Sequence, residues 1–164
     1  MKKGMPTPPK RGIRYWLMKS EPSEFAITDL KSKQKSRWDG IRNYQVRNML
    51  RDEIQVGDYA LFYHSNAEQI GVVGEMRVIQ AAYPDPTQFD TKSVYFDAQS
   101  QPKNPRWLAI NVQFLTEYSS VITLAELKIS PVFKNSPLVQ KGNRLSIIPL
   151  SPAQYEFVSK RGRQ

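Results

Sequence analysis

Short apolar runs separated by turn residues predict several strands with short helices between them. Residues 15–18 and 59–63 are compact aliphatic and aromatic runs of the kind that form buried strands. The segment 70–79 has the composition of a strand but contains Gly71 and Gly74, which indicate a bulge or a sharp corner. Residues 107–114 alternate well enough for a long strand, and residues 144–148 are expected to form the last one.

Helix-start signals predict short helices around these strands. Ser23 is the expected N-cap of a first helix and Asn43 that of a second, and residues 124–127 form a third. A last helix begins with Pro152 in its first turn. The proline-rich segment 83–105 is expected to be mostly loop. Short strands, many turns and peripheral helices together predict an α+β fold, a small mixed barrel with helices around it.

The net charge of +9 is concentrated at the two ends of the chain. Residues 1–13 have the composition of a flexible basic arm, residues 14–159 form one folded domain, and residues 160–164 are a basic tail. Basic extensions favour nucleic acid by neutralising phosphates, although an extension that only improves solubility has the same composition. Inside the domain, residues 31–51 carry seven cations with Asp39 as the only acid.

Composition excludes several kinds of chemistry. The chain has no cysteine and one histidine, which excludes disulfides, thiolate or multi-histidine metal sites and cysteine catalysis. Neither nucleotide-binding glycine motif is present, and no apolar run approaches the length of a membrane span. We therefore expect a soluble intracellular protein with no cofactor and no membrane contact. We also expect a monomer, cytoplasmic in a bacterium or nuclear in a eukaryote.

Polar clusters at strand ends are the best candidates for a binding site. Lys19 and Ser20 follow one apolar strand, and His64 and Ser65 follow another. Such side chains could read the hydrogen-bonding edge of a heterocyclic base at an open rim. Trp38 lies in a polar, glycine-containing stretch and could supply a stacking face.

Each candidate also has a purely structural interpretation. Trp16 and Trp107 lie in apolar strands and are expected in the core, whereas Trp38 is expected to face a ligand. His64 could equally be a structural histidine. The arginines at and before the second helix form either a solvated face or a surface for phosphates: Arg42, Arg47 and Arg51.

The same segments resemble the EVE domain family. The matching motifs are residues 15–22 (YWLMKSEP), 38–45 (WDGIRNYQ), 62–66 (FYHSN) and 144–146 (RLS), and the likeness covers about residues 14–158. The resemblance implies a PUA-like fold related to the YTH domain, a small, strongly curved β-barrel surrounded by short helices. It also implies binding of nucleic acid with modified bases, notably modified cytosines, by taking a flipped base into a pocket.

Site residues follow from this resemblance. Trp38 would stack on the base or form a wall beside it, and the pocket would be lined by Lys19, Ser20, Asn43, Tyr63, His64 and Ser65 and closed by Arg144 and Ser146. On charge alone, the candidates for backbone phosphates are Arg42, Arg47 and Arg106. Asn143 departs from the usual serine of the family, which puts the modified-cytosine preference in doubt.

Three functions remain open from the sequence, and a fourth, a protein–protein scaffold, would require an exposed apolar patch that the sequence does not show. The first is a non-catalytic reader of modified bases in DNA, and the second is an RNA reader, since PUA-like and YTH domains include RNA readers. The third is an enzyme acting on a base or nucleotide with His64 as general acid or base, for which no partner residue is visible.

Overall fold

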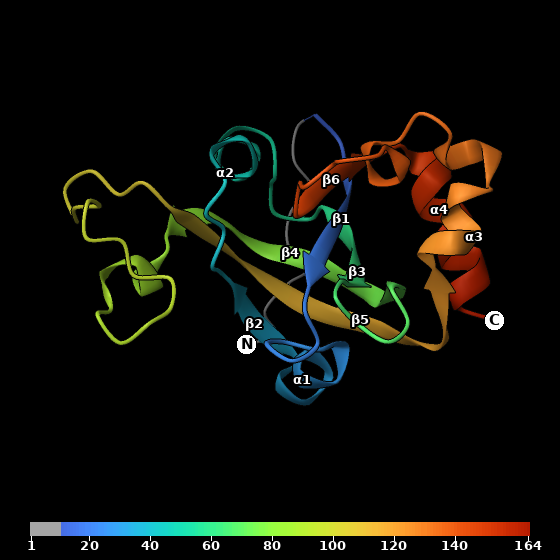
Figure 1. Ribbon diagram of the computed structural model, residues 1–164, viewed down its shortest axis with the longest axis horizontal. Helices are drawn as coiled ribbons and strands as arrows, with labels where there is room; N and C mark the ends of the chain where they lie inside the picture. The colour runs from blue at the N-terminus through green and yellow to red at the C-terminus, as the bar shows by residue number, and fades with distance from the viewer. Residues whose placement is uncertain (1–10) are drawn as a thin grey trace.

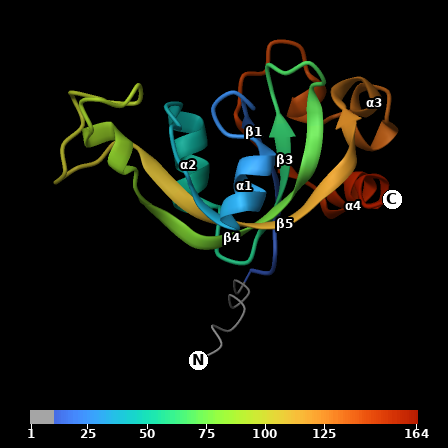
Figure 2. The same ribbon diagram turned by 90° about the horizontal axis from the view of Figure 1, so that it is seen from below.

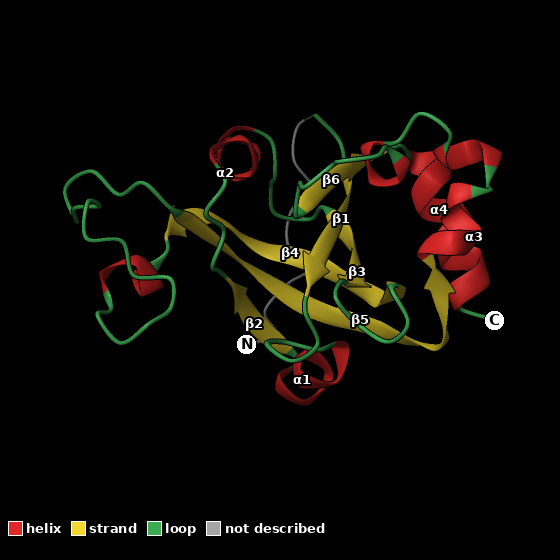
Figure 3. Cartoon of the chain, in the orientation of Figure 1, coloured by secondary structure: helices red, strands yellow, loops and turns green. Residues whose placement is uncertain are grey.

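A mixed sheet forms the centre of the molecule (Figures 1 and 3). The computed structural model describes residues 11–164, so residues 1–10 of the expected basic arm lie outside the described residues. The strands are β1 (Tyr15–Ser20), β2 (Lys35–Trp38), β3 (Tyr59–His64), β4 (Gly71–Pro84), β5 (Leu108–Thr123) and β6 (Ile147–Leu150). Their spatial order is β2-β5-β4-β3-β1-β6; β1 and β3 are parallel, and every other neighbouring pair is antiparallel.

The sheet is curved but does not close into a barrel. β2 and β6 form its two edges, so the α+β class is confirmed and the prediction of a barrel is wrong. The curvature comes from β4 and β5, which are long and bent (Figure 2). Their pairing register shifts at several points, including between Val72 and Gly74. Bulges of this kind bend and twist the bulged strand, and they curve the sheet without joining its edges.

Helices cover both faces of the sheet because successive strand residues point to opposite sides. Trp16 and Met18 of β1 belong to one core, which α1 (Ile27–Lys33) and α2 (Tyr44–Asp52) cover. Leu17 belongs to a second core, which α3 (Leu124–Lys128) and α4 (Pro152–Gly162) cover. Figure 1 shows α3 and α4 together beyond the end of β5, away from α2. The described residues also form three 3₁₀ helices: Pro86–Phe89, Pro131–Phe133 and Pro137–Val139.

The helix signals are correct in part. Asn43 caps α2 as predicted, since its side chain accepts a hydrogen bond from the Val46 N–H at 3.0 Å. Ser23 does not cap α1, which begins later, at Ile27; there the Asp29 carboxylate accepts from the Ala26 N–H at 2.8 Å. β2 was not predicted because only Trp38 among its residues is buried, so it lacks an apolar pattern.

Both described ends of the chain are bonded to buried carboxylates. Arg11, expected in the arm, donates to the fully buried Asp58 at 2.8 and 3.2 Å. Residues 160–162, expected in a tail, continue α4, and Arg163 donates to the buried Glu75 at 2.9 and 3.1 Å. Each contact satisfies a carboxylate that would otherwise be buried without its cation. No helix of the described chain is both long enough and apolar enough to cross a membrane.

Candidate base-binding cavity

A cavity of about 1170 Å³ opens where three strand ends meet, and we call it the Trp38 cavity. β1 and β3 are parallel and Ser20 is aligned with His64, so both strands end at the same edge of the sheet. β6 is antiparallel to β1, which brings the residues before β6 to the same place. The cavity is lined by Lys19, Ser20, Glu21, Glu24, Phe25, Lys33, Lys35, Ser36, Arg37, Trp38, Asp39, Gly40, Ile41, Arg42, Ser65, Val94, Tyr95, Arg144 and Ser146.

Trp38 lines this cavity although it is only 7% exposed. Its ring packs edge-to-face against Phe25 and Phe62, with centroids 6.2 and 5.2 Å away. Because so little of the indole is exposed, Trp38 forms a wall of the cavity and does not offer a whole stacking face. Burial of Trp16 and Trp107 confirms the prediction that they belong to the core.

The indole N–H of Trp38 differs from those of the other two tryptophans. Trp16 donates to Asp58 at 3.0 Å, and Trp107 donates to Asp97 at 2.7 Å. The Trp38 N–H has no partner among the hydrogen bonds of residues 11–164, and it is not one of the buried unpartnered atoms, so solvent reaches it. An indole N–H that bonds to water can exchange that bond for one to a ligand. Trp38 therefore brings an unused donor to the cavity.

Backbone hydrogen bonds hold the polar end of the cavity together. Lys19 N–H donates to the Ser146 carbonyl at 2.8 Å, and Ser65 N–H donates to the Ser20 carbonyl at 3.0 Å. The Ser20 hydroxyl donates to the Phe25 carbonyl at 2.6 Å. Burial lowers the pKa of Lys19 from its ordinary value. Lys19, Ser20, Trp38, Ser65, Arg144 and Ser146 are thus brought together as the motifs suggested.

Three predicted pocket residues do not line this cavity. The Asn43 side chain is used in capping α2. His64 Nε2 accepts a hydrogen bond from the Ile27 N–H at 3.2 Å, and burial lowers the pKa of His64, which favours the neutral imidazole that can accept this bond. Tyr63 points to the opposite face of the sheet, where it packs in the second core and lines a different cavity. The alternation of side chains along β3 separates Tyr63 from the residues that it adjoins in the sequence.

The arginines proposed for phosphates all have partners within the protein. Arg42 lines the cavity, but its guanidinium donates to Asp85 at 3.0 Å and to the Tyr95 carbonyl at 2.7 Å. Arg47 donates to the Arg106 carbonyl at 3.0 Å and lies over the Tyr44 ring. Arg106 donates to Gln99 at 3.0 Å.

The buried carboxylate of Asp85 organises the wall beside Arg42. Burial by itself would raise the pKa of Asp85, but hydrogen bonds from Thr87, Gly40 and Arg42 outweigh it, and the pKa is lowered. Asp85 therefore stays ionised and fixes both the Arg42 guanidinium and the Gly40 backbone. The main role of Arg42 visible in the fold is to hold this wall in place.

The proline-rich segment supplies a wall of the cavity that was not predicted from the sequence. Tyr95 lines the cavity, and its hydroxyl donates to the Glu24 carboxylate at 2.8 Å. Burial, followed by this contact with Glu24, raises the pKa of Tyr95 to about 12. Arg37 and Asp39 also line the cavity and pair at 2.7 Å. The available signal was the aromatic pair of Tyr95 and Phe96 inside a mostly polar loop.

Asn143 does not lie at the edge of this cavity. Its side-chain oxygen accepts a hydrogen bond from the Leu145 N–H at 3.0 Å, and the residue lines the same second cavity as Tyr63. Its neighbour Arg144 lines the Trp38 cavity. The departure from the family motif therefore changes the neighbouring surface, and the lining of the Trp38 cavity is unaffected.

Comparison with known proteins identifies the family. The family model for the EVE domain matches residues 14–161. This chain belongs to the EVE domain family. Thymocyte nuclear protein 1 of Homo sapiens is 41% identical over 163 residues, covering 88% of this chain and 72% of the human protein.

Solved structures of similar proteins agree with the fold. A Pseudomonas syringae protein superposes with a TM-score of 0.87 at 43% identity, over 90% of this chain and 98% of that one. Human THYN1 in complex with 5-methylcytosine-containing DNA superposes with a TM-score of 0.81 at 40% identity, over 92% and 98%. A YTH domain of Zygosaccharomyces rouxii has a TM-score of 0.53 at 13% identity, which shows a shared fold alone.

Proposed function

We propose that this EVE domain is a non-catalytic reader that takes a modified base, a modified cytosine in DNA, into the Trp38 cavity. The observation that carries the proposal is the unpartnered N–H of Trp38, which lines a cavity rich in polar groups. A flipped base loses its stacking and pairing, so the cavity must supply contacts to both its face and its edge. The human relative whose structure contains 5-methylcytosine DNA supports the choice of ligand.

The cavity contains both kinds of contact. Phe25, Trp38 and Tyr95 provide apolar and aromatic surface, and an added methyl group on the base would be buried against it. The Trp38 N–H can donate to a ring nitrogen or carbonyl of the base. Glu21 lines the same cavity, and a carboxylate can accept from the exocyclic amino group of cytosine.

Electrostatics favour a polyanion at the rim. The cations Lys19, Lys33, Lys35 and Arg144 line the cavity and make no ion pair with any residue from 11 to 164. Of the acids, Asp39 is paired with Arg37, and Glu24 accepts from Tyr95. A nucleic-acid strand around the cavity mouth would therefore approach a surface with unpaired positive charge.

The position of His64 supports a binding role without catalysis. Its Nε2 accepts a backbone hydrogen bond, and the residue does not line the cavity. A general acid or base must reach the reacting group directly or through one water molecule. We therefore assign His64 to holding the start of α1 against β3.

Fluorescence polarisation at one fixed salt concentration tests the proposal. The probes are matched DNA duplexes and RNA strands with cytosine, 5-methylcytosine or 5-hydroxymethylcytosine at one position. A preference of tenfold or more for one modified DNA, about 1.4 kcal/mol, is expected. Equal affinity for all probes would overturn the reader assignment, and a preference confined to RNA would replace DNA as the ligand.

A further inference from the structure

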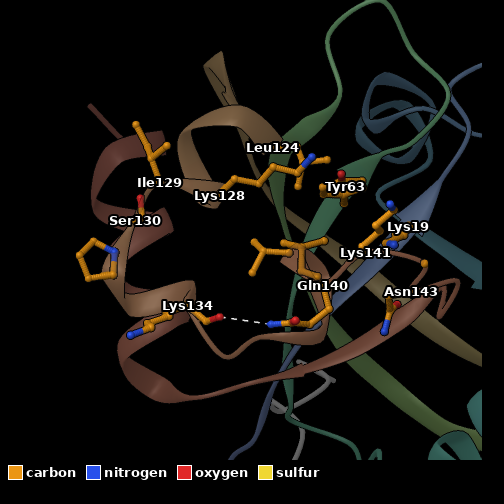
Figure 4. Close-up of a pocket in the computed structure, with 14 residues that line it drawn as sticks. Lys19, Tyr63, Leu124, Lys128, Ile129, Ser130, Lys134, Gln140, Lys141 and Asn143 are labelled. Carbon is orange, nitrogen blue, oxygen red and sulfur yellow. Dashed lines mark hydrogen bonds between the residues drawn. The ribbon is translucent and has the colours of Figure 1, made fainter.

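A second cavity, of about 1120 Å³, lies on the other side of the segment that precedes β6 (Figure 4). We call it the lysine cleft. It lies between the ends of β1 and β3 and the chain from α3 to residue 143. Its lining residues are Lys19, Tyr63, Leu124, Lys128, Ile129, Ser130, Pro131, Lys134, Leu138, Val139, Gln140, Lys141, Gly142 and Asn143.

The charge of the lysine cleft has one sign. Lys19, Lys128, Lys134 and Lys141 line it, and no acidic residue from 11 to 164 does. None of these lysines forms an ion pair in the described part of the chain, in contrast to Lys31 and Lys160, which have glutamate partners. Gathering like charges without counter-charges is unfavourable, so the cleft is suited to an anionic ligand.

Tyr63 adds a hydroxyl donor to the cleft. The residue as a whole is 3% exposed, and its hydroxyl has no partner among the hydrogen bonds of residues 11–164. The hydroxyl is not one of the buried unpartnered atoms, so solvent reaches it from the cleft. Burial raises the pKa of Tyr63 to about 12, so the hydroxyl keeps its proton and can donate. Lys19 Nζ lies 5.7 Å from the centre of the same ring. The floor of the cleft therefore has one unused neutral donor beside a cation.

The loop that carries Lys134 and Lys141 is held by hydrogen bonds within it. Gln140 Nε2 donates to the Lys134 carbonyl at 3.2 Å. Gly142 adopts a left-handed conformation (φ +79°), and Asn143 caps the turn by accepting from the Leu145 N–H. Figure 4 shows the Lys128 side chain extending toward Tyr63 and Lys134 at the opposite end of the cleft. The cations are thus spread along the cleft, as an extended anion would require.

The lysine cleft adjoins the Trp38 cavity. Lys19 lines both, and the consecutive residues Asn143 and Arg144 line one each. A strand with one base in the Trp38 cavity carries phosphates on both sides of that base, spaced a few ångströms apart. Ammonium groups bind phosphates as mobile point charges and read no sequence.

We propose that the lysine cleft binds the phosphodiester backbone of the strand next to the base that enters the Trp38 cavity. This rests on the proposed function. The cleft would supply affinity that is common to modified and unmodified DNA, while the Trp38 cavity would supply the preference between them. Asn143, which replaces the usual serine of the family motif, lines this cleft and would therefore lie beside the phosphates.

The test compares two triple variants of equal charge loss in the full chain. One replaces the cleft lysines that lie outside the Trp38 cavity, as Lys128→Gln, Lys134→Gln and Lys141→Gln. The control replaces Lys92, Lys103 and Lys160 by Gln, which line neither cavity. Binding to duplexes with cytosine or 5-methylcytosine is measured by fluorescence polarisation over a range of salt concentrations.

The cleft variant is expected to lower affinity for both duplexes by roughly tenfold or more and to reduce the salt slope by about 2–3. The ratio of the two affinities should not change. The control triple should change the slope by less than about 1. Tyr63→Phe, which keeps the ring and removes the hydroxyl, should lower the affinity for both duplexes equally, by roughly two- to tenfold.

Equal slopes for the cleft and control triples would overturn the cleft assignment, even if the wild type prefers 5-methylcytosine. A change in the affinity ratio would also overturn it, because the cleft would then act on the base. If the wild type shows no preference but the cleft triple alone reduces the slope, the reader function fails and the phosphate site stands. The two proposals can therefore fail separately.

Discussion

The ring of Tyr95 occupies the space beside Gly40 that a side chain would fill. A β-carbon on Gly40 would lie 2.7 Å from Cζ of Tyr95, and Gly40 also has a left-handed backbone (φ +78°). Glycine is thus required twice, for its conformation and for the approach of the tyrosine. This contact places the proline-rich segment against the Trp38 cavity and fixes one of its walls.

Gly40→Ala should displace Tyr95 and weaken binding of modified DNA by about tenfold or more, because a cavity wall moves. Gly12→Ala is the matched control, since Gly12 also has a positive φ (+86°) but no atom of residues 11–164 lies within 4 Å of a β-carbon there. In both variants the free energy of unfolding should fall by about 1 kcal/mol, because alanine is strained at a positive φ. Equal binding by the two variants, measured by fluorescence polarisation, would contradict the role of this wall.

Arg163→Ala should make the protein more sensitive to acid. Burial by itself raises the pKa of Glu75, but hydrogen bonds from Arg163, Tyr118, Tyr155 and Ser159 outweigh it and lower the pKa. The contribution of Glu75 to stability is therefore present above the ordinary glutamate pKa of about 4.3 and lost as pH falls through the lowered value.

Without Arg163 the folded-state pKa of Glu75 rises, so the acid-unfolding midpoint should move to higher pH. The expected loss at neutral pH is about 1–2 kcal/mol, since the Arg163 side chain is 53% exposed. Lys160→Ala is the control, because its pair with Glu156 is exposed and should contribute less than about 0.5 kcal/mol. Circular dichroism across pH measures both variants, and identical acid transitions would argue against this role of Arg163.

Arg11→Met should destabilise the fold by about 2–4 kcal/mol, because Asp58 is fully buried and loses its cation. Asp58 would keep its bonds from Trp16 and from backbone N–H groups. Arg14→Met is the control, since Arg14 makes a half-exposed contact with Glu53 at 3.8 Å. Its loss should lower the free energy of unfolding by less than about 1 kcal/mol. Denaturant unfolding compares the two, and equal midpoints would show that Arg11 does not support Asp58.

Sequence patterns predicted the parts of this fold whose signals are local. The apolar runs of β1 and β3 and the cap at Asn43 need only neighbouring residues to be recognised. The edge strand β2 and the openness of the sheet were missed, because both depend on pairing between distant segments. Glycine in a strand occurs both where a bulge curves an open sheet and where a sheet closes into a barrel. The glycines of the sequence therefore do not distinguish the two.

The candidate site was also predicted only in part. Lys19, Ser20, Ser65, Arg144 and Ser146 lie together because parallel strand ends share an edge, which motif order alone suggested. Tyr95 could not be assigned, because its place depends on a loop that folds back over Gly40. The unused N–H of Trp38 is visible only when the partners of Trp16 and Trp107 are known.

The most direct test of the base-binding cavity is the ratio of affinities for 5-methylcytosine and cytosine duplexes in Trp38→Phe. Phenylalanine retains most of the packing against Phe62 but removes the N–H donor. The ratio should fall by roughly two- to tenfold, the usual contribution of one hydrogen bond. In Trp107→Phe, which alters a tryptophan outside the cavity, it should not change. An unchanged ratio in Trp38→Phe, or an equal fall in both variants, would contradict the assignment of this cavity as the reader site.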